Sequence, residues 1–347
     1  MVCIAAFIIL ALIGGFVAIV SIFKPKVGKS YWKLFKKAWG CLSKKIRLQK
    51  CETGFKDDVK NTILSRVIIK HPKWAKPLSI VVEVVSVLIV VVVVWALITA
   101  VKSLLALWVL GTCNVTKPAA CTLGAEVCSI DEGEPKNIIE ATGRWFEEWG
   151  EIFSAIPDKF KEYKAENYDF SYIDIDVSED KPIAVDIFDP GCLICASSYI
   201  NQKNSGFFNK YNVRLVPFAI QDTEGNYKFK NSEIIVRYMF AVEQTHSGLA
   251  MQILDKVFSE SKNGVSYQTL FNQAFSREES IEVLESWLDE FGLDEGSIKQ
   301  IREITNYPEI TDKMNKNKEI VEKELHVKGI PTMIYDGKKH TGLYKTE

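Results

Sequence analysis

One short stretch constrains the fold more than any other: residues 182–195, which read Pro-Ile-Ala-Val-Asp-Ile-Phe-Asp-Pro-Gly-Cys-Leu-Ile-Cys. Its first half is apolar and rich in β-branched residues, and it predicts a buried strand over residues 182–188. A Pro-Gly break follows, and Cys192 and Cys195 then stand at the start of a predicted helix over residues 192–204. Unpaired amides and the helix dipole lower the pKa of a thiol in that position, so this layout predicts a redox-active cysteine pair.

The neighbouring segments predict an α/β unit around this cysteine pair. Residues 170–177 alternate apolar and polar side chains, as a half-buried strand does, and residues 213–220 predict a third strand. A strand, a helix and a strand of these lengths favour a βαβ unit with a parallel, right-handed crossover. Extended segments at residues 332–335 and 339–343 close the chain, and the Asp336-Gly337 pair between them predicts a hairpin turn.

Residues 231–326 predict helices throughout, so a helical insertion interrupts the α/β unit. Several of these helices begin with Ser or Thr followed by an acidic residue, which is typical of helix N-caps. The expected helices are residues 232–245, 247–260, 266–275, 278–291, 295–304 and 311–326.

Two apolar stretches predict membrane anchoring. Residues 1–23 carry no charged side chain, and residues 79–111 carry only Glu83 and Lys102. A helix needs about 20 apolar residues to cross a bilayer, so each stretch predicts a transmembrane helix. A signal peptide is the alternative for residues 1–23, but no positive charge precedes the apolar core and no small-residue cleavage site follows it, which favours a retained anchor. Lys102 is expected to mark the outer membrane interface, because a lysine inside the bilayer is costly.

The charge distribution predicts the orientation of both spans. Residues 24–78 hold 16 Lys and Arg against three acidic residues, whereas residues 112–347 hold 26 against 40. Positive residues beside membrane spans stay in the cytoplasm, so residues 24–78 are expected to form a basic cytoplasmic loop. The N-terminus and residues 112–347 then lie outside, on the periplasmic or extracellular face of the cytoplasmic membrane. Aromatic and basic residues at helical spacing in the loop favour an amphipathic helix on membrane lipid over nucleic-acid binding.

The cysteines sort by compartment. Cys41 and Cys51 fall in the predicted cytoplasmic loop and are expected to be free thiols. Gly, Pro and Thr surround the outward-facing cysteines and argue against regular structure there, so residues 112–165 begin with a linker. Two of the three linker cysteines are expected to form a disulfide, and the third could pair with Cys3 or exchange with the redox pair. These linker cysteines are Cys113, Cys121 and Cys128, and their spacing does not favour zinc, so no metal site is expected.

The second part of this segment predicts an amphipathic helix. Residues 136–156 place apolar side chains, Trp145 and Trp149 among them, on one helical stripe that ends before Pro157. The stripe is expected to pack on the domain or on a second copy of the chain, and docking on the outer membrane leaflet is the alternative.

Gly-Cys-Leu-Ile-Cys after a strand, a helical insertion, and then Gly-Ile-Pro-Thr before a strand and Asp-Gly together resemble the thioredoxin-fold disulfide oxidoreductases of the bacterial Dsb type. The resemblance covers about residues 168–343 and implies a thioredoxin-like α/β domain over residues 166–347, with a helical insertion at residues 231–326. It implies that Cys192 is the nucleophilic, more exposed cysteine and that Cys195 is the resolving one. Pro331 matches the family's cis-proline, which leaves the backbone of Ile330 free to pair with an extended substrate. Asp186 matches the buried carboxylate that moves a proton to or from the resolving cysteine.

The resemblance also implies a function. The chain is expected to be an enzyme, a membrane-anchored thiol–disulfide oxidoreductase that acts on exported cysteine-containing proteins without a cofactor. As an oxidase it would be reoxidised by a quinone-linked membrane partner, and as a reductase or isomerase it would receive electrons instead. Leu193 and Ile194 replace the His that strong oxidants of the family carry between their cysteines, so a less oxidising potential is expected.

Two other functions remain open from the sequence. One is a non-enzymatic thioredoxin-fold module of an envelope or secretion assembly, and the other is a metal-binding domain that uses Cys192, Cys195 and the linker cysteines. Relatives usually add a helix after the last strand, so residues 136–164 are expected to cover that face of the sheet.

Overall fold

The structure is a computed structural model, and it describes residues 32–33, 35–40, 43–44, 47, 75–115, 127–130, 135–175, 180–222 and 224–345. The chain divides into two compact units, Met1–Val101 and Lys102–Glu347. The predicted span at residues 1–23 lies outside the described residues, as do Cys3, Cys41, Cys51 and Cys121.

Helix α4, Ala75–Leu110, contains the second apolar stretch. Its segment Glu83–Leu110 is the one candidate membrane span among the described residues, with a mean hydropathy of 3.1. In the basic loop, the described residues 32–33, 35–40 and 43–44 are helical, in agreement with the expected amphipathic helix.

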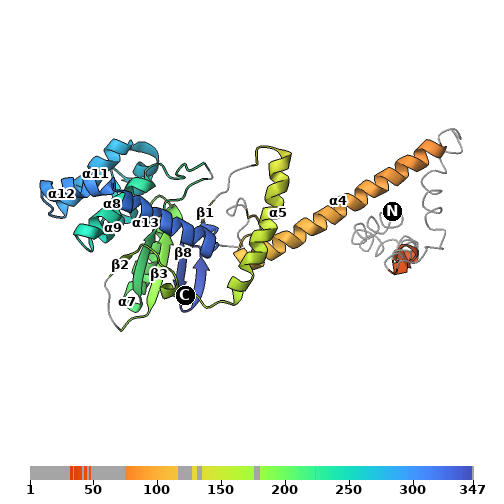
Figure 1. Ribbon diagram of the computed structural model, residues 1–347, viewed down its shortest axis with the longest axis horizontal. Coiled ribbons are helices and arrows are strands. Elements are labelled where there is room, and N and C mark those ends of the chain that lie inside the picture. Colours follow the sequence, from red (N-terminus) through yellow and green to blue (C-terminus); the bar gives the residue numbers. More distant parts are fainter. Residues whose placement is uncertain are drawn as a thin grey trace. The chain divides into compact units, whose positions relative to one another are not determined.

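The second unit is built around a five-stranded sheet in the order β2-β4-β3-β8-β9 (Figure 1). The strands are β2 (Ile173–Ile175), β3 (Ile183–Phe188), β4 (Asn212–Pro217), β8 (Thr332–Tyr335) and β9 (Lys338–Thr341). β3 and β4 are parallel and the other neighbours are antiparallel, which confirms the predicted strands and the βαβ unit. β3 is central and lies between two paired strands, so its apolar residues form the middle of the main core.

Local sequence signals account for the turn between β8 and β9 and for the peptide bond before β8. Asp336 and Gly337 adopt φ angles of 49° and 73°, which Asp and Gly tolerate in a tight turn, so the predicted hairpin is confirmed. The Ile330–Pro331 peptide bond before β8 is cis, as the family resemblance implies.

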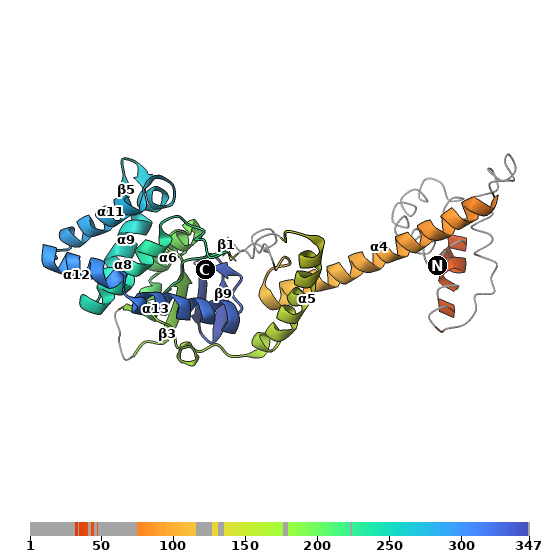
Figure 2. The same ribbon diagram turned by 45° about the horizontal axis from the view of Figure 1, so that its top comes forward.

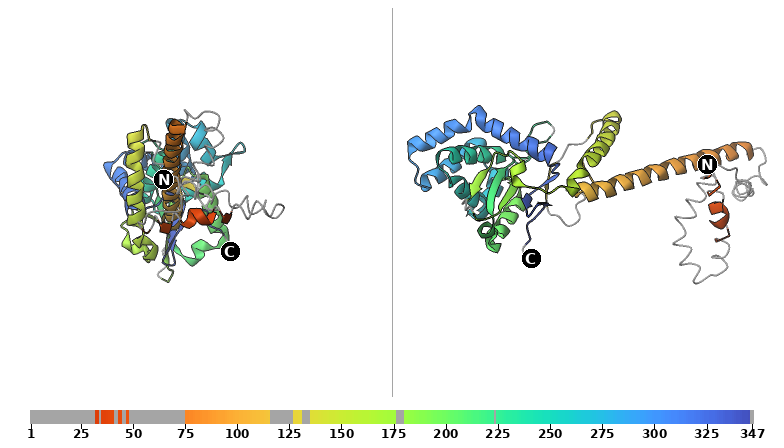
Figure 3. Two further views of the ribbon diagram at one scale, coloured as in Figure 1. Left: turned by 90° about the vertical axis from the view of Figure 1, so that its right-hand side faces the viewer. Right: turned by 60° about the horizontal axis from the view of Figure 1, so that its bottom comes forward.

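Helix α6, Leu193–Ser205, follows β3 and ends at Gly206, whose φ of 74° lets the chain turn away. Helices α8 to α12 group together beyond one end of the sheet (Figure 2), and α11 to α13 arch over α8 and α9 in the right-hand view of Figure 3. The helices after α6 are α7 (Phe207–Lys210), α8 (Ser232–Thr245), α9 (Leu249–Ser259), α10 (Tyr267–Thr269) with the π-helical turn η5 (Leu270–Ala274), α11 (Arg277–Glu290), α12 (Glu295–Thr305), and α13 (Pro308–Glu319) with the π-helical turn η6 (Ile320–Glu324).

The prediction of helices throughout residues 231–326 is wrong at one point. A small antiparallel hairpin, β5 (Ser261–Lys262) and β6 (Val265–Ser266), follows α9. Its turn is Asn263-Gly264, and both residues have positive φ angles. Asn-Gly is a strong hairpin signal, and here it interrupts the helical pattern.

Helix α5, Ile138–Ala155, confirms the predicted amphipathic helix and is capped by the Asn137 side chain. Its apolar stripe is divided between two environments. Ile152 is buried with Ala106 and Val115 in a small separate core. The exposed members of the stripe are Ile138, Ile139, Phe146 and Phe153. The segment after α5 contributes four buried residues to the main core: Tyr163, Ala165, Tyr168 and Phe170.

The side chain of Lys102 is buried within the protein, and its place at the outer membrane interface stays a prediction. Its side chain forms an ion pair with Glu148 of α5 and lies 5.5 Å from the centre of the Trp145 ring. A carboxylate and an aromatic face together compensate for the loss of hydration of a buried ammonium group.

Candidate thiol–disulfide site

The turn between β3 and α6 places Cys192 at the first turn of the helix. The amide of Gly191 donates to Asp189 Oδ1 at 2.7 Å, and the amide of Cys192 donates to the Asp189 carbonyl at 3.0 Å. Cys192 is the N-cap residue of α6, and its Sγ accepts the amide of Cys195 at 3.3 Å. The Cys192 sulfur, the expected nucleophile, therefore accepts a hydrogen bond from an amide of the first helical turn that has no carbonyl partner within the helix.

Two amide side chains of the helical insertion hold this turn from the other side. Gln268 Nε2 donates to the carbonyls of Pro190 and Cys192 at 2.7 and 3.0 Å. Asn272 Nδ2 donates to the Gly191 carbonyl at 2.7 Å. The sequence analysis did not single out these residues, because nothing local to α10 and η5 indicates that they contact a turn so far away in the chain.

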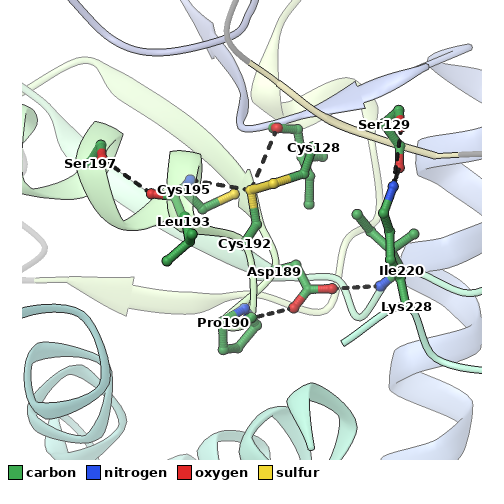
Figure 4. The surroundings of a disulfide bond; sticks show 12 residues. Cys128, Ser129, Asp189, Pro190, Cys192, Leu193, Cys195, Ser197, Ile220 and Lys228 are labelled. Atoms are coloured by element: carbon green, nitrogen blue, oxygen red, sulfur yellow. Dashed lines mark hydrogen bonds between the residues drawn. A yellow bond between two sulfur atoms is a disulfide. The ribbon is translucent and has the colours of Figure 1, made fainter. Parts of the chain in front are cut away.

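Cys192 forms a disulfide with Cys128, with 6.1 Å between the two Cα atoms, while Cys195 is a free, buried thiol (Figure 4). One prediction needs correction: Cys192 is fully buried rather than exposed, and it is bonded to the Cys128 segment. Cys128 is the linker cysteine that pairs with the redox site, which is one of the two partners that the sequence left open for the third linker cysteine. Cys113 is also disulfide-bonded.

The Cys128 segment is a strand that occupies the edge predicted for substrate. β1 (Cys128–Ser129) pairs antiparallel with β7 (Gly329–Ile330), and Cys128 lies opposite Ile330. The amide of Ile130 continues the pairing by donating to the carbonyl of Lys328 at 3.1 Å. The backbone of Ile330 is therefore not free, as the family resemblance implied, but is paired with the chain's own linker.

Two buried carboxylates lie near the Cys195 thiol. Asp186 Oδ2 accepts a hydrogen bond from Gln202 Nε2 at 2.8 Å, and burial raises the pKa of this carboxyl to about 6. Asp189 Oδ2 accepts the amide of Ile220 at 2.7 Å, and burial raises its pKa to about 6 as well. Burial and the charges of both carboxylates raise the pKa of Cys195 well above its usual value.

Asp186 is thus buried, as predicted, and Asp189 is a second buried carboxylate that the sequence analysis missed. The available signal was the position of Asp189 at the carboxyl end of a buried strand, directly before Pro190. A metal-binding domain would need a group of at least three His, Cys, Asp or Glu side chains that could hold a metal ion. Among the described residues there is no such group.

We predict that Asp186→Asn changes the pH dependence of stability. The folded-state pKa of about 6 exceeds the unfolded value of 3.8, so the folded protein binds more protons between these pH values. The free energy of unfolding then falls as pH rises through this window. Urea unfolding should show the variant gaining up to roughly 3 kcal/mol relative to the parent between pH 4 and pH 7.

The matched control is Asp312→Asn, which removes an exposed carboxylate on α13. This control should shift stability by a few tenths of a kcal/mol. An equal response of both variants at pH 4 and pH 7 would contradict the assignment of Asp186 as a destabilising buried charge.

Comparisons with known proteins found similar solved structures. No family model and no curated protein matches the sequence. A thioredoxin-like oxidoreductase from Silicibacter pomeroyi is 19% identical, with 47% of this chain and 79% of that chain covered and a TM-score of 0.34. The thiol-disulfide exchange protein α-DsbA2 from Wolbachia pipientis is 19% identical over 51% and 82%, with a TM-score of 0.36. MdbA, a thiol-disulfide oxidoreductase from Corynebacterium diphtheriae, is 16% identical over 50% and 91%, with a TM-score of 0.36.

Each of these thioredoxin-like or thiol–disulfide oxidoreductase structures aligns with about half of this chain. A fold alone does not define the chemistry, which depends on the cysteines of the site.

Proposed function

We propose that the chain is a membrane-anchored thiol–disulfide oxidoreductase that uses Cys192 and Cys195 on exported cysteine-containing proteins. One observation carries the proposal. The Cys192 sulfur is engaged in a disulfide at the first turn of α6, and the free Cys195 thiol stands one helical turn further on, directed at that disulfide (Figure 4). A thiol beside a disulfide is the arrangement that exchange requires.

The proposed reaction has two steps. A substrate thiolate attacks Cys192 of the Cys192–Cys195 disulfide, which forms a substrate–Cys192 disulfide and releases Cys195 as a thiolate. A second substrate thiolate then attacks its own mixed disulfide and leaves Cys192 and Cys195 reduced, with two electrons transferred to them. The same steps run in reverse for reduction of a substrate disulfide, with Cys195 resolving the mixed disulfide.

The buried carboxylates serve proton transfer in this scheme. Cys195 has a strongly raised pKa, so it is protonated when it is released and must lose that proton to attack. With pKa values of about 6, Asp186 and Asp189 exchange protons near neutral pH. Asp186 is the proposed proton carrier of the family resemblance, and the buried position of Asp189 adds a second candidate.

Charge and hydropathy support the proposed location. The apolar segment of α4 is long enough to span a membrane, and the basic residues lie before it and the acidic residues after it. Residues 112–347 would then face the periplasm or the cell exterior, where disulfides persist. A quinone-linked membrane protein is the proposed redox partner if the enzyme works as an oxidase.

A trapping experiment tests this function. The full chain with Cys128→Ser and Cys195→Ala, purified in detergent and reduced, is incubated with a peptide that carries an activated mixed disulfide. The peptide should become linked to Cys192 and remain there, because neither resolving thiol is left. The matched variant, Cys128→Ser with Cys192→Ala, keeps the buried Cys195 instead and should form the adduct far more slowly.

Absence of the Cys192 adduct would favour the alternative function, a non-enzymatic module of an envelope or secretion assembly. One observation supports that alternative: Cys192 is buried under β1 and bonded to Cys128, as a structural disulfide would be.

A further inference from the structure

Strand β1 binds beside Cys192 in the manner of an extended peptide. It adds to the edge of β7 through antiparallel pairing, with Cys128 opposite Ile330, and its cysteine is bonded to Cys192. The Cys192 sulfur lies 3.9 Å from the carbonyl oxygen of Ile330, so the disulfide and the paired edge adjoin. Addition of a strand to an open edge is a common way in which proteins bind peptides.

Contacts specific to this segment hold β1 in place. Lys228 Nζ donates to the backbone carbonyl of Ser129 at 2.8 Å and to its Oγ at 3.1 Å. Val127 packs so closely on Gly329 that a Cβ atom at Gly329 would lie 3.1 Å from the Val127 Cβ. Both contacts are made by side chains outside the cysteine pair, so the site is shaped for this segment and the disulfide is not its sole attachment.

We propose that Cys128 is a third redox-active cysteine and that residues 127–130 are a tethered internal substrate of the Cys192 and Cys195 pair. This inference rests on the proposed function and deepens it. It assigns the site an internal occupant with the chemistry that an external substrate must match: an extended segment that carries a cysteine opposite Ile330.

The exchange step is balanced and needs no external oxidant. The Cys195 thiol loses its proton, and its sulfur attacks Cys192 Sγ. The Cys128–Cys192 bond breaks, the Cys192–Cys195 bond forms, and Cys128 leaves as a thiolate that takes up a proton. One disulfide and one thiol are present before and after the step, so the closed and open forms have the same oxidation state.

The two forms differ in access to the site. In the closed form, which the structure shows, β1 covers Cys192 and occupies the β7 edge. In the open form, the Cys192–Cys195 disulfide is available and the β7 edge is vacated. An external substrate competes with a segment of the same chain, whose effective concentration is high because it is tethered.

Disulfide mapping of the full chain in detergent tests this inference. The oxidised protein is equilibrated in a glutathione buffer, quenched with acid, alkylated and digested with pepsin, and both disulfide-linked peptides are quantified. The parent should contain both disulfides in exchange, and Cys195→Ser should contain Cys128–Cys192 alone.

Lys228→Ala should lower the ratio of Cys128–Cys192 to Cys192–Cys195 by about tenfold, since a charged donor to Ser129 is lost. Lys313→Ala, which breaks a surface ion pair on α13, is the matched lysine control and should leave the ratio unchanged.

The second readout is the initial rate at which the oxidised protein oxidises a reduced two-cysteine peptide. Cys128→Ser should raise this rate by a factor of one plus the ratio of closed to open form in the parent, because only the open form reacts. Equal and measurable rates in Cys128→Ser and the parent would overturn the inference and leave the proposed function standing. A Cys128–Cys192 disulfide that never converts to Cys192–Cys195 would also overturn the inference, and peptide oxidation by Cys128→Ser would then decide whether the proposed function stands. A protein that interconverts the two disulfides and yet oxidises no peptide, even with Cys128→Ser, would instead overturn the proposed function.

Discussion

Replacement of Cys192 by serine should abolish thiol–disulfide exchange by the full chain, with a fall in rate on the order of a thousandfold or more. Both steps of the proposed reaction pass through the Cys192 sulfur, which forms the bond to substrate and the bond to Cys195. A serine hydroxyl keeps the shape of the side chain but is not ionised near neutral pH and forms no disulfide. The measurement is oxidation of a reduced two-cysteine peptide by the detergent-solubilised protein.

The matched control for this prediction is Cys195→Ser. After reduction, this variant combined with Cys128→Ser should still react with an activated disulfide through Cys192, but it should not turn over, because neither resolving thiol is left. If Cys192→Ser retained a rate within a few fold of the parent, the exchange would depend on other cysteines and the proposed site would be wrong.

Replacement of Gly191 by alanine should lower the free energy of unfolding by about 3 kcal/mol, the upper part of the usual range for overpacking. A Cβ atom at this position would overlap the Cβ and Cγ atoms of Phe229 and lie 2.9 Å from Asn272 Oδ1. The turn that carries Cys192 would have to move away from Asn272, which donates to the Gly191 carbonyl. Thermal unfolding should show a decrease in Tm of roughly 6–12 °C for a unit of this size.

Gly143→Ala provides the matched substitution, since no atom lies within 4 Å of a Cβ atom built at this position in α5. The control should be neutral or slightly stabilising, because alanine favours a helix interior. Similar losses in both variants would show that the close packing around Gly191 does not determine its effect.

Local patterns predicted the elements around the cysteine pair because the information lies within a few residues. The apolar run before Pro190, the helix after Cys192 and the Asp336-Gly337 turn each rest on neighbours in sequence, and the structure has all three. The missed hairpin at Asn263-Gly264 carried the same kind of signal, but strong helical patterns on both sides outweighed it.

The contacts that close the site could not be predicted in this way. Cys128 and Cys192 are separated by 64 residues, and three linker cysteines were equally available as partners. Only the packing of β1 on β7 selects Cys128. The same holds for Gln268, which reaches the turn from the helical insertion and has no local feature that marks it as part of the site.

The equilibrium reduction potential of the Cys192 and Cys195 pair tests the central claim most directly. The full chain is equilibrated in a series of thiol–disulfide buffers, and the alkylated thiols of both cysteines are counted by mass spectrometry. A redox-active pair should titrate reversibly as a two-electron couple between about −270 and −120 mV, the span of known exchange proteins. The Leu193-Ile194 dipeptide favours the less oxidising part of this range. A site that stays oxidised below about −300 mV, as structural disulfides do, would contradict the account.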